Sequence, residues 1–405
     1  MAENLTNTSQ TITQEPIPPL WTGTFASFLF TNFCIFMGFN MLLPTLSVFL
    51  DAQNCSETEI GFVIGSFTIT SVAARLLANT LSRHLGTLKV ARAGLLICAL
   101  GTPFFFLFMN LPSYLVARLA QGAGFGVTST LLVTLASKTI PHSRLGEGIG
   151  YLGLGATAAL TFGPLAGIYI ADTWGFVTMF EAMSLCYLIA SLISFAIPQL
   201  ELTTQPEKPG ENLSNFFEKR ALPAAYLMAI YGTGISGIAA FLALYCAKLN
   251  LPSAAIFFGV STFGTVISRV TGGRILDRHG HRYVILPSVF LLSLAVLILI
   301  VLPGVFMLYF AAILYGLGSG GFFPSIQTLA LSSVPPSRRT LASAYFFVAL
   351  DVGMGVGAFL MGFLAGLFQT YRVVFIGVFI VFLSLPGFYL LLFPQTAKIN
   401  APKTT

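Results

Sequence analysis

Charged side chains are scarce in this sequence. Only 8% of the 405 residues are Asp, Glu, Lys or Arg, whereas 56% are hydrophobic. Soluble globular domains carry roughly 25% charged residues, so the composition excludes an ordinary soluble protein. The net charge is +6, but the basic residues sit in short clusters between apolar runs. That distribution is typical of a membrane protein and speaks against nucleic-acid binding.

Cysteine and histidine are also few. The five cysteines and four histidines show no paired spacing and no metal-ligand spacing. The sequence therefore predicts neither a disulfide framework nor a metal site. It contains no nucleophile elbow and no phosphate-binding loop. We therefore expect no catalytic residue, no metal and no cofactor.

Long apolar runs make up most of the chain. A helix needs ~20 apolar residues to cross a bilayer. We predict an all-α membrane protein with twelve spanning helices. They run approximately over 22–49, 57–80, 88–109, 113–137, 145–170, 175–198, 222–247, 254–275, 283–303, 307–332, 340–367 and 372–394.

A polar segment separates the sixth predicted span from the seventh. We expect a tail at 1–21, a six-helix bundle at 22–198, a linker at 199–221, a second bundle at 222–394 and a tail at 395–405. Most basic residues fall in the linker and in loops on its side of the membrane, whereas only Lys248 and Arg372 fall in loops on the other side. By the positive-inside rule, both termini then face the cytoplasm.

The two halves of the sequence repeat one another. A shift of 194 residues aligns residues of the same type without a gap over about ninety residues. The aligned pairs include Arg75 with Arg269, Gly86 with Gly280, Gly122 with Gly316, Pro141 with Pro335 and Arg144 with Arg338. Such repeats predict two related bundles that rock about a site between them.

A basic patch lies between the eighth and ninth predicted spans. It reads Gly273-Arg-Ile-Leu-Asp277-Arg278-His-Gly280-His-Arg282, and we expect a tight turn there because charges are costly in hydrocarbon. The patch resembles the loop signature of the major facilitator superfamily of transporters. The resemblance implies two pseudo-symmetric six-helix bundles. It also implies a gate in which Asp277 docks at the start of the fifth span, near Arg144. The alternative is a basic loop that only sets the orientation.

The first-half copy departs from this signature. Asn79 stands in place of the first glycine and Arg83 in place of the acid. An arginine cannot make the same favourable contact with a helix N-terminus, because its charge has the wrong sign. The gating residues that the resemblance implies are Gly273, Asp277, Arg278, Gly280, Arg83, Gly86 and Arg144.

The fourth predicted span contains Arg118-Leu-Ala-Gln121-Gly122, which resembles the family motif Arg-x-x-Gln-Gly. An arginine inside the membrane is a candidate functional residue. It could contact an anionic group of the substrate or a titrating acid. Alternatively, it is a structural arginine that extends toward the membrane surface or binds backbone carbonyl groups.

The fifth predicted span contains a glycine and proline pattern that resembles the motif associated with antiporters of this family. Its residues are Gly150, Gly163, Pro164 and Gly167. The pattern favours efflux over uptake. A helix that is merely closely packed is the alternative.

Asp351 lies near the middle of the eleventh predicted span. A carboxyl group there is neutral unless a cation pairs with it, which suits a group that alternately binds a proton and a cationic substrate. The segment also resembles a bacterial efflux subgroup that includes sugar-efflux-like proteins and metallophore exporters. A structural Asp bonded to a neighbouring helix is the alternative. We assign proton coupling to Asp351, Arg118 and Glu181.

Polar side chains on the spans that line the site in the family are candidates for a substrate cavity. They are Asn32, Asn40, Gln121, Tyr231, Tyr315, Gln327 and Tyr345. Each could instead join two helices.

These features predict a secondary active transporter of the bacterial inner membrane that exports a small drug-like molecule or metabolite in exchange for protons. Its partners are then a small-molecule substrate, protons and the lipid bilayer, and nothing requires more than a monomer. One alternative is a proton symporter that imports a sugar, an amino acid or an organic anion, with Arg118 holding the anion. The other is a membrane enzyme or a non-transporting receptor, against which the internal repeat and the lack of a catalytic cluster weigh.

Overall fold

The structure is a computed structural model, and it describes residues 20–141, 144–197, 218–301, 304–335 and 338–394. Over these residues it is helical and contains no strand. Twelve of the described helical segments are long and apolar enough to cross a membrane, which confirms the predicted fold class. Both predicted tails up to residue 19 and from 395, and the predicted linker up to residue 217, lie outside the described residues.

The first half of the chain contains α1 (Gly23–Ala52), α2 (Glu57–Leu85), α3 (Thr87–Gly101), α4 (Phe104–Leu107), α5 (Leu111–Thr139), α6 (Leu145–Trp174) and α7 (Phe176–Ala196). Helices α3 and α4 together make one crossing, Thr87–Leu107. The second half contains α8 (Leu222–Lys248), α9 (Ala254–His279), α10 (Arg282–Val301), α11 (Val305–Ser332), α12 (Arg339–Phe368) and α13 (Arg372–Leu392). These bounds follow the predicted spans within a few residues at most ends.

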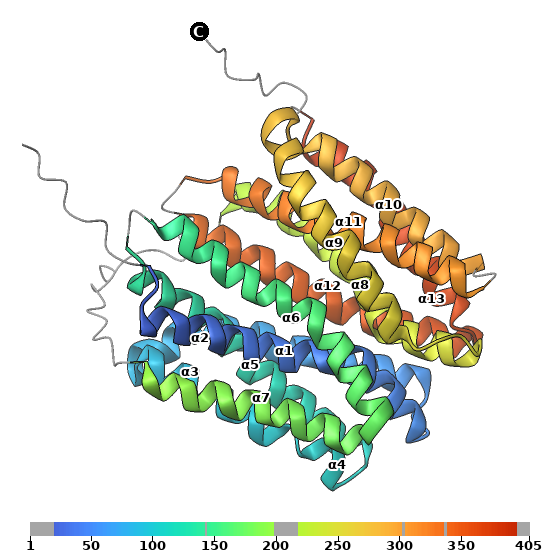
Figure 1. Cartoon of the computed structure of the whole chain (residues 1–405), viewed down its shortest axis with the longest axis horizontal. Coiled ribbons are helices and arrows are strands. Elements are labelled where there is room, and N and C mark those ends of the chain that lie inside the picture. Colours follow the sequence, from blue (N-terminus) through green and yellow to red (C-terminus); the bar gives the residue numbers. More distant parts are fainter. Residues whose placement is uncertain (1–19, 142–143, 198–217, 302–303, 336–337, 395–405) are drawn as a thin grey trace, which may run out of the picture.

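Each half packs mainly on itself. Helix α1 packs on α6 and α7, and α5 packs on α2 and α3. In the second half, α8 packs on α12 and α13, and α11 packs on α9 and α10. Figure 1 shows α1–α7 in blue to green beside α8–α13 in yellow to red. The largest contact between the two sets joins α2 to α12.

The internal repeat is confirmed by matching contacts in the two halves. At Gly122 an added Cβ atom would collide with the backbone oxygen of Phe67. At Gly316 it would collide with the backbone oxygen of Ser261, and both residues are 194 positions further along. Gly126 and Gly320 repeat the relationship against the backbone oxygens of Ser71 and Thr265. The same shift therefore relates helix packing as well as sequence.

The predicted turn at Gly273–Arg282 is mostly helix, which corrects that expectation. Helix α9 continues through Gly273 and Arg278 to His279, and only Gly280, with a φ of 88°, and His281 form the turn. The segment from Gly273 to His279 contains no proline, so the helical hydrogen bonds of α9 continue beyond the hydrocarbon region. The helix ends where Gly280 adopts a positive φ. Likewise, α2 continues through Arg83, and its turn is at Gly86, with a φ of 90°.

The molecule has two ends that matter for its function. We call the end that carries Gly86, Arg144, Gly280 and Arg338 the linker end, because the chain leaves α7 and enters α8 there. The opposite end carries the short connections after α1 and α8, and we call it the Lys248 end.

Candidate functional site

An ion pair joins the two halves inside the helical part of the molecule. The Nε atom of Arg75 on α2 lies 2.9 Å from Oδ2 of Asp351 on α12. Only 12% and 11% of the two side chains are exposed. A buried carboxylate is stable as an anion when a cation and hydrogen-bond donors face it. Arg75 therefore supplies the cation that the position of Asp351 requires.

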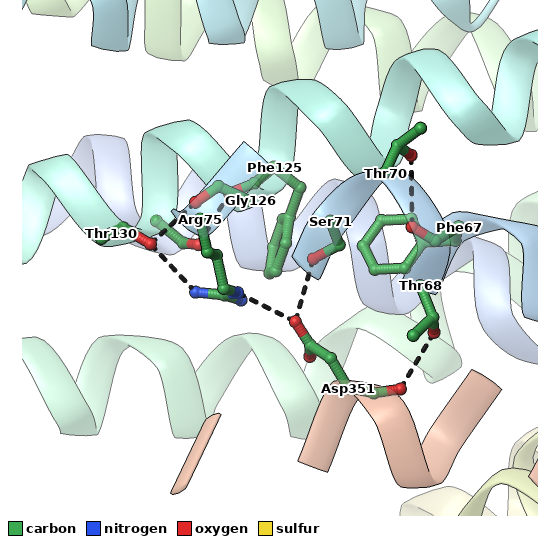
Figure 2. A network of polar contacts seen from close by, with 10 residues as sticks. Phe67, Thr68, Thr70, Ser71, Arg75, Phe125, Gly126, Thr130 and Asp351 are labelled. Atoms are coloured by element: carbon green, nitrogen blue, oxygen red, sulfur yellow. Dashed lines mark hydrogen bonds and ion pairs between the residues drawn. The ribbon is translucent and has the colours of Figure 1, made fainter. Parts of the chain in front are cut away.

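Further hydrogen bonds hold this pair in place (Figure 2). Ser71 Oγ donates to Oδ2 of Asp351 at 2.9 Å, and Thr68 Oγ1 donates to its backbone oxygen at 2.9 Å. Arg75 Nη1 donates to Thr130 Oγ1 on α5 at 3.3 Å, and the guanidinium carbon lies 5.7 Å from the centre of the Phe125 ring. Ser71 and Arg75 lie one turn apart on α2, so both face the same carboxylate.

Arg118 is buried on α5, with 1% of the residue exposed. Its Nη2 atom donates to the backbone oxygen of Ile64 at 3.0 Å, and Nη1 donates to Gln121 Oε1 at 3.3 Å. The guanidinium carbon lies 4.8 Å from the centre of the Phe67 ring. Its Nε atom is buried without a hydrogen-bond partner. Among the described residues, no carboxylate lies within ion-pair distance of Arg118.

A small cavity lies between the halves and touches both charged groups. Its volume is about 20 Å³, and both Arg118 and Asp351 line it. Apolar side chains make up most of the rest of its wall, with contributions from α1, α2, α8 and α12: Phe39, Leu43, Ile64, Phe67, Ala240 and Met354. A space of this size holds about one water molecule. The cavity is therefore too small for a substrate in this conformation. Its wall carries one basic side chain, Arg118, and one acidic side chain, Asp351.

Glycines allow α2 and α12 to approach closely between this cavity and the Lys248 end. A Cβ atom on Gly61 would lie 2.6 Å from the backbone oxygen of Ala358, and one on Gly65 would lie 2.7 Å from that of Gly355. Near the helix ends, a Cβ atom on Gly366 would lie 2.6 Å from Thr58 Oγ1. Small residues let membrane helices pack backbone to backbone. The two halves are thus pressed together from the ion pair to the Lys248 end.

Polar contacts at the Lys248 end also link the two halves. Lys248 Nζ lies 3.8 Å from Glu57 Oε1 and 4.5 Å from the centre of the Tyr371 ring. Ser253 Oγ donates to Asp172 Oδ2 at 3.2 Å. These contacts are exposed, so each contributes little by itself. They nevertheless mark this end as closed.

The predicted cavity residues of the first half make hydrogen bonds within that half. Asn32 donates to the backbone oxygen of Leu152 on α6 at 3.0 Å, and Asn40 donates to that of Phe36 on its own helix at 2.7 Å. Gln121 lies beside Arg118, and its Nε2 donates to Thr102 Oγ1 at 3.4 Å. Asn32 and Gln121 thus join helices of the first half, and Gln121 also holds the arginine that lines the cavity.

The predicted cavity residues in the second half do not line this cavity. Tyr231 is buried and stacks on Phe322 at 4.8 Å between ring centres. Tyr315 packs against Phe257 at 5.6 Å. Gln327 is partly exposed on α11, and Tyr345 packs on a small apolar cluster at the linker end. The structure therefore brings Asp351, Arg118 and Gln121 together and leaves these four elsewhere in the second half.

Glu181 lies on an exposed face of α7, which packs on α1 and α3. It takes no part in the network around Asp351. The hydropathy pattern places Glu181 inside a span but does not say which way its helix is turned.

The predicted motif residues mostly lie at contacts between helices or at helix ends. Gly163 and Gly167 pack against the backbone of Asn40 and Met41 on α1, and Pro164 is buried within α6. Arg144 precedes α6, and its N–H donates to the backbone oxygen of Pro141. The repeat-related Arg338 makes the same bond to Pro335. The side chain of Asp277 and the surroundings of Gly150 lie outside what the structure describes.

The sequence analysis missed Arg75 and the hydroxyl groups around Asp351. Arg75 lies inside the predicted span 57–80, so the reasoning that singled out Arg118 applied to it equally. Its repeat mate Arg269 was a second signal. Ser71 and Thr68 carry no such signal, because hydroxyl groups are common in membrane helices.

The structure contains no group of three or more His, Cys, Asp or Glu side chains that could hold a metal, over the residues it describes. Its described cysteines are all free thiols. The charged groups of the site are thus Asp351 and its surrounding arginines.

Two related sets of membrane-spanning helices, with a buried ion pair between them, define a transporter of the major facilitator class. The chain belongs to the Major Facilitator Superfamily, because the model of that family matches residues 28–275 and 226–404. It is therefore a multi-pass membrane transporter.

Two relatives show how far the similarity extends. The staphylopine export protein of Staphylococcus aureus is 25% identical over 337 residues, which cover 80% of this chain and 84% of that protein. An uncharacterized MFS-type transporter of Methanocaldococcus jannaschii is 21% identical over 345 residues, which cover 83% of this chain and 89% of the relative.

Solved structures share the fold. A mutant of the nucleoside transporter NupG superimposes with a TM-score of 0.76 at 16% identity, over 91% of this chain and 100% of that one. A bacterial homolog of the human lysosomal transporter Spinster, inward-facing and unoccupied, superimposes with a TM-score of 0.74 at 13% identity, over 94% and 98%.

Proposed function

We propose that the protein exports a small molecule across the bacterial inner membrane in exchange for protons, with Asp351 as the proton-binding group. The observation that carries the proposal is the ion pair between Asp351 and Arg75, which joins the two halves. A proton on Asp351 would remove the charge that holds Arg75, so protonation and separation of the halves are coupled.

We further propose that the linker end faces the cytoplasm. Exposed arginines gather there, among them Arg83, Arg278 and Arg282, and cytoplasmic loops carry such an excess. The Lys248 end then faces outward, and the conformation described above is closed on the outside. We also propose that the protein works as a monomer in the bilayer.

The energy of the pair is large enough to control a conformational equilibrium. Removing one partner of a buried ion pair costs about 3–5 kcal/mol. Because the two side chains are about one-eighth exposed, the lower limit applies. A change of about 3 kcal/mol shifts an equilibrium roughly a hundredfold. One proton on Asp351 can therefore turn a mostly closed population into a mostly open one, provided the two states are nearly balanced.

An exchange cycle follows from this coupling. From the cytoplasm, a substrate with a cationic group competes with Arg75 for Asp351 and loosens the contact between α2 and α12. The Lys248 end opens, and an outside proton neutralises Asp351 and releases the substrate. The protonated protein returns, loses its proton to the cytoplasm and re-forms the pair. Each substrate that leaves is thereby exchanged for a proton.

Export is favoured over import by two observations. One is the similarity, along most of both chains, to the staphylopine export protein. The other is the tight packing of Gly163 and Gly167 on α1, in a pattern that resembles the antiporter motif.

Proton symport is the second candidate function. The observation that favours it is Arg118, a buried cation that faces no carboxylate among the described residues. An imported organic anion could neutralise it.

Inverted membrane vesicles test the direction. Their interior is acidified, a fluorescent dye reports the proton gradient, and amines, amino acids and dipeptides are added outside. Dequenching by a compound establishes antiport, and it should disappear in Asp351→Asn but persist in Asp51→Asn, a control at an exposed acid near the end of α1. If no compound dequenches the dye, while some enter right-side-out vesicles with protons, the symport function replaces export.

A further inference from the structure

The surroundings of Arg118 differ from those of a purely structural arginine. Arg92 on α3 provides the comparison. Its Nε and Nη2 atoms donate to the backbone oxygen of Ser194 at 3.2 and 2.7 Å, and Nη2 also reaches that of Ile197 at 3.2 Å. These carbonyls lie at the end of α7, where the helix dipole favours a cation. Arg92 also lies over the Phe195 ring at 4.4 Å. It is thus held by an aromatic ring and by two backbone carbonyl oxygens, which accept from Nε and Nη2.

Arg118 also lies over an aromatic ring, that of Phe67, but it lacks a hydrogen-bond acceptor for its Nε atom. Its carbonyl partner, Ile64, lies inside α2 rather than at a helix C-terminus, and the Nε atom of Arg118 has no acceptor although it is buried. A buried donor without a partner and a buried cation without an anion are both costly. The Nε atom of Arg92 thus has a carbonyl acceptor, whereas the Nε atom of Arg118 is buried without one, and Arg118 lies at the wall of a cavity.

Asp351 lines the same cavity and supplies the opposite charge. In the present conformation Arg75 neutralises it. Once Arg75 is displaced, the cavity presents one cation and one anion, with Phe39, Phe67 and Met354 as apolar wall. A ligand complementary to such a lining carries an anionic group, a cationic group and an apolar body.

We propose that the substrate is an amphoteric molecule whose carboxylate binds Arg118 and whose ammonium group binds Asp351. This inference rests on the proposed function, since it takes the cavity to be the closed form of the transport site. A carboxylate would accept a hydrogen bond from the Nε–H group of Arg118, which has no acceptor in this conformation. The two oxygens of a carboxylate match the donor geometry of a guanidinium. The ammonium group is the part that displaces Arg75. A molecule with only one of the two groups leaves one charge of the site without its partner.

Charge selectivity measured by equilibrium binding tests this assignment without a proton gradient. Purified protein in lipid nanodiscs is titrated with an apolar amino acid series (leucine, methionine, phenylalanine) and their dipeptides. Each probe is compared with its methyl ester, which keeps only the cation, and its N-acetyl derivative, which keeps only the anion. We expect the unmodified probes that bind to bind at least about tenfold more tightly than either derivative, the difference expected of one charge-assisted contact.

Variants separate binding by Arg118 from a structural role. In Arg118→Met the advantage of the free acid over its methyl ester should disappear, and in Arg118→Lys it should return in part. Arg92→Met is the matched control and should keep the full advantage even if it lowers stability. The ratio of two affinities in one variant is insensitive to a general loss of folded protein.

Three results would overturn the assignment. One is a methyl ester that binds wild type as well as its parent acid, and another is an absence of binding by every unmodified probe. The third is an acid-to-ester ratio that Arg118→Met leaves unchanged, which would make Arg118 structural. A full charge preference together with no proton movement in vesicles would instead overturn the proposed coupling and leave the substrate class standing.

Discussion

Arg75 Nε and Asp351 Oδ2 lie 2.9 Å apart, although the two residues are 276 positions apart in the sequence. They belong to different halves of a molecule in which each half packs mainly on itself. Ser71 donates to the same carboxylate oxygen. The charge state of one carboxyl group thus bears directly on how the halves meet.

Removing either member of this pair should destabilise the protein more than removing both. Arg75→Met leaves a buried carboxylate and Asp351→Leu leaves a buried guanidinium, and each should cost about 3 kcal/mol in the free energy of unfolding. The double variant should lose less than the sum of the two, because no uncompensated charge remains. Unfolding in mixed detergent micelles measures this, with Arg282→Met as the exposed control. Additive losses would show that the pair is not energetically coupled.

The close approach of α2 and α12 should depend on the absence of side chains at Gly61 and Gly65. Gly61→Val or Gly65→Val places atoms within 3 Å of the opposite backbone, so the closed form at the Lys248 end should become less populated. Cysteines introduced at Thr58 and Gly366 in a cysteine-free background should cross-link readily without these changes and poorly with them. Gly387→Val is the control, since nothing lies near that position. Equal cross-linking in all variants would contradict the packing.

The exposed pair of Lys248 and Glu57 should matter much less. Lys248 is 56% exposed and its Nζ lies 3.8 Å from the carboxylate, and such pairs contribute about 0–1 kcal/mol. Glu57→Gln should therefore change thermal stability only slightly, and less at high salt than at low salt. A loss as large as that of Asp351→Leu would show that this end, rather than the buried pair, holds the halves together.

Cys55 offers a test of the proposed orientation. It lies between α1 and α2 at the Lys248 end, and burial, with Glu59 and then Asp51 nearby, raises the pKa of its thiol. A raised pKa means little thiolate at neutral pH, so labelling should be slow at pH 7 and faster as the pH rises. A membrane-impermeant maleimide should label it in whole cells or right-side-out vesicles. Protection there, with labelling in inverted vesicles, would place the linker end outside.

The sequence predicts the twelve spans well because crossing a membrane needs a long apolar run, which composition alone reveals. It predicts helix ends less well. The charges of Gly273–Arg282 suggested a loop, but charged residues outside hydrocarbon are compatible with helix, and α9 continues to His279. Only the glycine with positive φ, Gly280, ends it.

The candidate site shows the same difference between what composition reveals and what packing decides. Asp351 stands out because an acid inside an apolar run is rare, and Arg118 because a motif surrounds it. Arg75 was singled out only for its match with Arg269 in the repeat, because hydropathy does not give the direction in which α2 presents a side chain. That direction depends on the packing of α2 on α12 through Gly61 and Gly65, which involves residues almost 300 positions apart. Tyr231 and Tyr345 pack on apolar side chains in this conformation, and a tyrosine in a span is as suited to packing as to binding.

The most direct test of the coupling is the distance across the Lys248 end as a function of pH. Spin labels at the exposed positions Asn54 and Thr370, one on each half, report that distance by pulsed electron paramagnetic resonance in nanodiscs without substrate. Wild type should be closed at alkaline pH and should open as the pH falls far enough to protonate Asp351, because the ion pair is then lost. Asp351→Asn should be shifted toward the open form and should no longer respond through this range, while Asp51→Asn, a change at an exposed acid, should follow wild type. A distance in wild type that does not change with pH, or an Asp351→Asn variant that still opens as wild type does, would contradict the account.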